Sequence, residues 1–256
     1  MAKKAKKTKE TIEIKETGKC CFCDKVYENS GHNTVGYWKE EEEKKGYGKL
    51  KRCCDECYET KLLPALKEKF LKTEFFILSW EAAVQQRNEG QKLFKDGISD
   101  DDKYEFKRKL FEKTETILND YENNSVKADV HHGNLLEIQG VFKDYKEKIF
   151  GDNSYAFNFS TAQKYFNMMC KYYWCAGFIE EPPELPIDSI NLAKIGRKDE
   201  KWTKKIKEIP DYEEMIMNFR SNESVLNEGS LAVWELKNWE RRGDLGQFFD
   251  ECEIED

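Results

Sequence analysis

Two pairs of cysteines near the amino end have the spacing of a metal site. Two residues separate Cys20 from Cys23 and Cys54 from Cys57, and thirty residues lie between the pairs. This spacing lets both sulfurs of a pair converge on one ion, and two such pairs commonly hold zinc in tetrahedral geometry. The four cysteines are therefore the predicted ligands of one zinc ion. A closed site of four thiolates has no open coordination position, so this zinc is expected to be structural.

Neighbouring residues leave the set of ligands open. Cys21 and Cys53 adjoin the two pairs, and His32 could replace one thiol. We favour the two matched pairs because their common spacing rarely arises by chance. The second pair opens a helix predicted to begin near Tyr58, where the positive end of the helix dipole favours thiolates. A turn, a connecting loop and a second pair at a helix start resemble a treble-clef finger.

Beyond the cysteines, the pattern predicts a mainly α-helical protein with the zinc module as an N-terminal appendage. Apolar residues recur at helical spacing in several segments, namely 58–90, 101–122, 135–149, 160–176, 211–220 and 230–242. Only Thr11–Lys15 has the alternation of a short strand. The predicted organisation is a flexible basic arm at 1–18, a zinc module at 19–60, a helical domain at 61–249 and an acidic tail at 250–256.

The composition of the chain limits which kinds of molecule the protein is expected to bind and in which cellular compartment it is expected to lie. The net charge of −7 argues against a protein that coats nucleic acid by bulk attraction. Apolar runs fall short of the roughly 20 residues that a membrane span needs, and no secretory signal follows the first lysines. We therefore expect a cytoplasmic protein with no membrane partner. Its nine cysteines are expected to be reduced thiols or metal ligands.

A second candidate site lies between residues 160 and 196. Ser160 and Gln163 match a capping box at a helix start, and Gly177 would end that helix after Ala176. Lys164 then falls in the first turn, where the positive helix pole disfavours an ammonium group, so its pKa is expected to fall if it is partly buried. A lysine with a lowered pKa can act as a nucleophile.

Asp188 follows a proline-rich connection that delivers it to the start of the next helix. Two interpretations stay open. In the first, Asp188 is a helix N-cap and Lys164 is a surface residue of a packed helix. In the second, the two side chains face a shared cleft and do chemistry together.

The arrangement from Lys164 to Pro186-Ile-Asp188 is similar to one known family. It resembles the catalytic lysine and aspartate of the helix-hairpin-helix DNA glycosylases, especially the archaeal 8-oxoguanine branch, over residues 160–195. The resemblance implies that Lys164 attacks the sugar C1′ of a flipped nucleotide and that Asp188 stabilises the developing positive charge. Residues 153–160 lack the Gly-hydrophobic-Gly hairpin that binds the DNA backbone in most of that family.

Other catalytic patterns have less support. Asp188 with Asp199 and Lys201 resembles the PD-(D/E)xK nucleases, in which two carboxylates hold Mg²⁺ and a lysine orients water, but those motifs lie on paired strands. His131-His132 is expected between helices, as a structural or solvent-facing pair. The chain has no phosphate-binding glycine loop, no G-x-S-x-G turn and no H-E-x-x-H helix.

Two functional hypotheses follow from these residues. The first is a DNA-acting, glycosylase- or lyase-like enzyme that uses Lys164 and Asp188, with the zinc module gripping the substrate. The second is a non-catalytic helical adaptor whose zinc module and acidic surface bind another protein. The basic run from Lys194 to Lys207 could contact nucleic acid locally, or it could be a solvated face.

Overall fold

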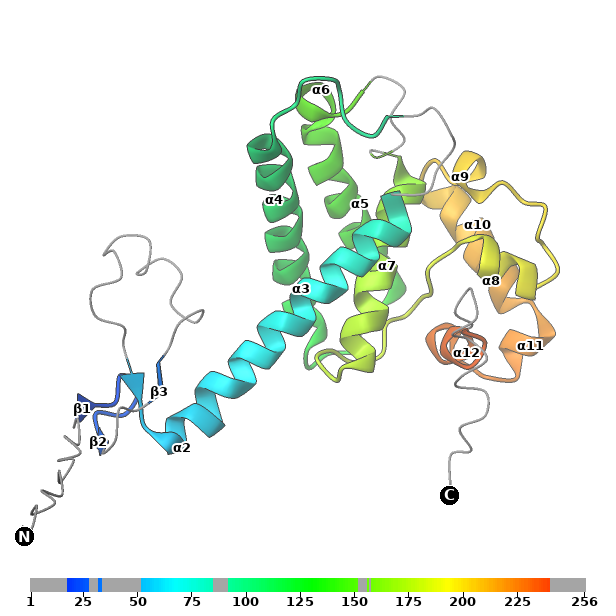
Figure 1. Cartoon of the computed structure of the whole chain (residues 1–256). Helices are drawn as coiled ribbons and strands as arrows, with labels where there is room; N and C mark the ends of the chain where they lie inside the picture. The colour runs from blue at the N-terminus through cyan, green and yellow to red at the C-terminus, as the bar shows by residue number, and fades with distance from the viewer. Residues whose placement is uncertain are drawn as a thin grey trace, which may run out of the picture. The chain divides into compact units, whose positions relative to one another are not determined.

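The computed structural model describes residues 18–27, 32–33, 52–84, 92–151, 156 and 158–239. Within these residues the protein is mainly helical, which confirms the mainly α-helical part of the predicted fold class (Figure 1). The chain divides into two compact units, Met1–Thr73 and Glu74–Asp256. The strand predicted at Thr11–Lys15, nearly all of the predicted basic arm and the acidic tail lie outside the described residues. The domain boundaries proposed from the sequence stay predictions.

The first unit contains two short antiparallel strand pairs followed by a helix. Strand β1 (Gly18–Lys19) pairs with β2 (Val26–Tyr27), and β3 (His32–Asn33) pairs with β4 (Arg52–Cys53). The backbone N–H of Cys21 donates to the carbonyl of Arg52 at 3.0 Å, which joins the two pairs. The buried apolar cluster of this unit is small, and its members are Cys20, Cys53, Cys57 and Leu62.

The helical segment after Cys54 is continuous. It comprises α2 (Asp55–Cys57), a π-helical turn η1 (Tyr58–Leu62) and α3 (Leu63–Val84). Of the two forms that the sequence allowed for residues 58–90, the described part is therefore one long helix. Its carboxyl end buries the side chain of Trp80, whose ring lies 5.7 Å from that of Phe106.

Three long helices form the centre of the second unit. They are α4 (Asp100–Leu118), α5 (Ala128–Asp144) and α7 (Phe159–Cys175), and α5 packs against both of the others. A 3₁₀ turn, η2 (Asn119–Tyr121), ends α4, and the short α6 (Lys146–Ile149) follows α5. Their shared core is rich in aromatic side chains, including Phe106, Phe142 and Phe166, each fully buried. Burial of such rings supplies most of the stabilisation of a core like this.

Short helices complete the unit. They are α8 (Ser189–Lys194), α9 (Trp202–Lys205), α10 (Ile209–Arg220), α11 (Glu223–Leu226) and α12 (Leu231–Lys237). A nearly buried ion pair between Lys171 of α7 and Glu235 of α12, at 2.7 Å, holds the last helix in place. In the part of the chain that the structure describes, no helix has the length and apolar character needed to cross a membrane.

The buried aromatic core gives a direct stability prediction. Phe106 is fully buried in α4, so Phe106→Ala leaves a cavity and should lower the free energy of unfolding by about 3–5 kcal/mol. Tyr104 lies on the same helix but is 60% exposed, and Tyr104→Ala should change that free energy by at most about 0.5 kcal/mol. Urea denaturation followed by circular dichroism measures both. Equal effects of the two substitutions would contradict the assigned packing of α4.

Candidate metal centre

The turn between β1 and β2 positions the first cysteine pair. Asp24 adopts a left-handed conformation with φ of 59°, and its N–H donates to the carbonyl of Cys20 at 3.0 Å. The N–H of Cys20 in turn donates to the carbonyl of Lys25 at 2.9 Å, and the N–H of Phe22 donates to the Cys20 sulfur at 3.4 Å. The tight turn that results brings the thiols of Cys20 and Cys23 to the same side.

The start of the helical segment positions the second pair. Cys54 has an extended backbone at the N-cap of α2, and its carbonyl accepts from the N–H of Tyr58 at 2.9 Å. Cys57 lies three residues further on, within the first helical turn. The N-cap position of Cys54 and the first-turn position of Cys57 bring their sulfurs into one cluster.

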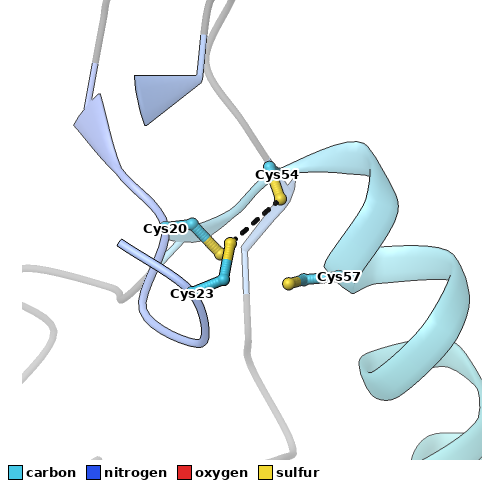
Figure 2. A group of neighbouring side chains, drawn as sticks. All are labelled: Cys20, Cys23, Cys54 and Cys57. Carbon is cyan, nitrogen blue, oxygen red and sulfur yellow. Dashed lines mark hydrogen bonds between the residues drawn. The ribbon is translucent and has the colours of Figure 1, made fainter. Parts of the chain in front are cut away.

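The four predicted ligands lie together in the folded protein (Figure 2). The sulfurs of Cys20, Cys23, Cys54 and Cys57 all lie within 4.8 Å of one another, and those of Cys23 and Cys54 are 3.8 Å apart. Tetrahedral zinc with Zn–S bonds of about 2.3 Å needs sulfurs about 3.8 Å apart. These four thiols could therefore hold a metal ion such as zinc.

The neighbouring cysteines fall outside this group. Cys21 is exposed, and Cys53 is fully buried but does not belong to the four-thiol cluster. Cys53 lies on β4, where successive side chains point to opposite faces, so Cys53 and Cys54 cannot both face the same point. Of the alternatives that the sequence left open, the geometry favours the two matched pairs. The side chain of His32 lies outside the described part of the chain.

The surroundings of the thiols affect their ionisation unequally. Burial opposes ionisation of Cys20, but hydrogen bonds from backbone amides outweigh it and lower the pKa of this thiol to about 6. Burial raises the pKa of Cys57, and the neighbouring thiols raise it further. Burial likewise raises the pKa of Cys53, to about 11. A metal ion would supply the positive charge that four thiolates at this separation require.

The second candidate pair also meets in the structure. Lys164 Nζ lies 3.3 Å from Asp188 Oδ2, and the two side chains are 16% and 13% exposed. The ammonium also lies 5.6 Å from the centre of the Trp202 ring. Because α7 begins at Phe159, Lys164 lies in the second helical turn rather than the first. The expected effect of the helix pole on this amine is weaker there, since that effect is confined to the terminal turn.

Asp188 also has a structural role, as the first of the two interpretations predicted. It is the N-cap of α8, and its Oδ1 accepts from the N–H groups of Ile190 and Asn191 at 2.9 and 3.0 Å. Its other oxygen contacts Lys164. Both oxygens of this carboxylate are therefore engaged with the protein itself. Ser189–Lys194 is a helix, whereas the nuclease pattern requires strands around this aspartate.

The predicted capping box at the start of α7 is wrong. The N-cap is Asn158, and the side chain of Ser160 contacts the carbonyl of Thr203. Gln163 instead exchanges two hydrogen bonds with the backbone of Ile187, at 2.8 and 3.1 Å. This reciprocal contact fixes the segment before Asp188 against α7. The predicted stop is confirmed, because Gly177 has a φ of 73° just after the helix.

A buried polar network surrounds the two adjacent histidines, which lie within α5 rather than between helices. His131 is fully buried, with Nδ1 2.9 Å from the Tyr121 hydroxyl and Nε2 2.8 Å from Asn167 Oδ1. His132 Nε2 lies 3.0 Å from the buried carboxylate of Glu184, and its Nδ1 lies 3.2 Å from Glu213. The doublet was visible in the sequence, but its partners are too distant along the chain to be recognised there.

The network shifts the pKa values of its two histidines in opposite directions. Burial lowers the pKa of His131 to about 4, so this ring is neutral near pH 7. The hydrogen bond with Glu184 raises the pKa of His132. Burial works to raise the pKa of Glu184, but the hydrogen bond from His132 and electrostatic attraction to the neighbouring imidazoles outweigh it, and that pKa is lowered. Asn134 donates a hydrogen bond to the Tyr121 hydroxyl, and the neutral His131 ring links this hydroxyl to Asn167 Oδ1.

Comparison with protein-family models, with curated proteins and with solved structures finds no match for this chain. The resemblance to helix-hairpin-helix glycosylases therefore rests on Lys164 and the Pro186-Ile-Asp188 segment alone.

The metal centre gives a testable difference between cysteines. Cys57→Ser removes a thiol of the cluster and should weaken zinc retention by about 100-fold or more, since loss of even an outer contact can cost 10–100-fold. Cys21→Ser changes an exposed thiol outside the cluster and should retain zinc as the wild type does. Competition with a chromogenic chelator measures retention. Equal release from both variants would contradict the assigned ligands.

The buried histidine predicts a pH dependence of stability. An unfolded histidine takes up its proton near pH 6.5, whereas folded His131 does so near pH 4. Between these values the unfolded state binds more protons, so stability should fall by about 3 kcal/mol as the pH is lowered from 6.5 to 4. NMR titration of the imidazole signals should show His131 neutral at pH 5 and a midpoint for His132 above that of a free histidine. A His131 midpoint near 6.5 would contradict the network.

Proposed function

We propose that this chain is a non-catalytic adaptor in which a structural zinc ion organises a protein-binding module on a helical domain. The observation that supports this proposal is the closed cluster of four thiols, which would leave no coordination position for a substrate. The tight turn at Cys20–Cys23, the short strands and the second pair at a helix start fit a treble-clef-like module. Such a module contributes folding energy rather than a reaction centre.

The side chains best suited to chemistry have structural partners. Asp188 caps α8 and contacts Lys164. His131 uses both ring nitrogens within the core, and His132 contacts two carboxylates. Groups that are satisfied in this way stabilise a scaffold and are not poised toward a bound molecule. This supports an adaptor over an enzyme.

Charge points to the class of partner. The chain carries a net charge of −7, which disfavours binding to nucleic acid by bulk attraction. A protein partner with a basic or mixed surface fits this balance better, because complementary charge guides association. The proposed role is therefore recognition of another protein.

A glycosylase- or lyase-like enzyme is the second candidate. The specific observation in its favour is the 3.3 Å contact between Lys164 Nζ and Asp188 Oδ2 in the segment that resembles that family. In this alternative the neutral lysine amine forms a bond to the sugar C1′ of a flipped nucleotide while the glycosidic bond breaks, so that the base leaves with the bonding electron pair. The aspartate stabilises the positive charge that develops on the sugar and accepts the proton that the amine loses. The lysine would first have to leave its ion pair, because attack requires the neutral amine.

Borohydride trapping separates the two candidates. The adaptor proposal predicts no covalent adduct between the protein and a panel of abasic or damaged DNA duplexes. An adduct that is lost in Lys164→Ala but kept in Lys198→Ala, a change of an exposed lysine, would overturn it in favour of the enzyme. Circular dichroism of each variant ensures that the loss of an adduct does not reflect unfolding.

A further inference from the structure

Helix α3 is apolar on two opposite faces. One face buries Ser79, Trp80, Ala83 and Val84. The other carries an exposed stripe whose members are Phe70, Leu71, Ile77 and Leu78, with exposures of 62%, 36%, 40% and 36%. At about 100° per residue these four positions fall within one third of the helix circumference. Helices that are apolar all round are normally covered, and exposed apolar patches mark interaction surfaces.

Three charged residues share this exposed face. Lys67, Glu74 and Glu81 follow one another at intervals of seven residues, which places them in line along the helix. Lys67 and Glu81 form no ion pair with another residue of the described part of the chain. Both side chains are exposed, so a partner that lies along α3 would meet their charges.

The order of these residues is symmetric about Glu74. Leu71 and Ile77 each lie three residues from Glu74, on opposite sides of it. Phe70 and Leu78 each lie four residues from it, and Lys67 and Glu81 each lie seven residues from it. If two copies of α3 pair antiparallel with a two-fold axis at Glu74, apolar positions meet apolar positions. Each Lys67 then meets Glu81 of the other copy, so both ends of the contact carry opposite charges.

We propose that a second copy of this chain docks on the stripe by antiparallel pairing of the two α3 helices. A two-fold interface is self-complementary by necessity, and a stripe with matched apolar and opposite-charge positions about one residue has that property. One helix pair buries less surface than the roughly 1,200–2,000 Å² of a stable interface, and two Glu74 carboxylates meet at the axis. The dimer is therefore weak and concentration-dependent.

Charge exchange tests the register of the pairing. Sedimentation velocity of the full chain across a concentration series should show a monomer–dimer equilibrium. Lys67→Glu or Glu81→Lys alone places like charges at both ends of the contact and should weaken dimerisation roughly tenfold. Combining Lys67→Glu with Glu81→Lys restores opposite charges and should return the dimerisation constant to within about twofold of the wild-type value. Lys69→Glu, an exposed change off the stripe, is the matched control and should have little effect.

Two outcomes would overturn the proposal. One is a protein that stays monomeric at every concentration reached. The other is a dimer that the double exchange fails to restore, or one that Leu78→Glu leaves intact, since either result would place the interface elsewhere. Glu74→Gln should strengthen the dimer by removing the repulsion at the axis. None of these measurements involves DNA or Lys164, so their result is independent of the trapping experiment.

Discussion

The convergence of four sulfur atoms is the constraint on which the first unit of the structure depends. Among the residues that the structure describes, its buried cluster consists of Leu62 and three cysteines with a few partly buried side chains packed against them, and so small a cluster gives two strand pairs little hydrophobic stabilisation. Contacts among four thiols at this separation stabilise the fold little by themselves, whereas a zinc ion would form a bond with each of the four sulfurs. The two turns that carry the cysteines are far apart along the chain, so the ion would close a long loop and stabilise the fold directly.

The helical unit depends instead on its aromatic core and on the polar contacts that cross it. Phe106, Phe142 and Phe166 fill the space between α4, α5 and α7, while His131 and Asn167 link their helices by hydrogen bonds. Buried polar groups in such a core cost free energy unless they are paired, and pairing fixes a single arrangement of the helices. The structure therefore accounts for several ionisable residues without assigning them a reaction.

Local sequence patterns predicted the cluster of four cysteines and the long helices, because both depend on short, regular spacing. The N-cap role of Asp188 was one of the two interpretations that the sequence left open, and the structure shows it. The shared cleft that the other interpretation required stays a prediction. The predicted capping box was wrong because the Gln163 side chain forms hydrogen bonds with the backbone of Ile187, which lies twenty-four residues away. The histidine network was missed for the same reason, since tertiary contacts that decide a side chain's role leave no local pattern.

The central claim is that Cys20, Cys23, Cys54 and Cys57 bind one zinc ion. X-ray absorption at the zinc edge, on protein purified without chelator, tests it most directly. The account predicts one zinc per chain with four sulfur neighbours at about 2.3 Å. A protein without bound metal, or a zinc ion surrounded mainly by nitrogen or oxygen, would contradict it.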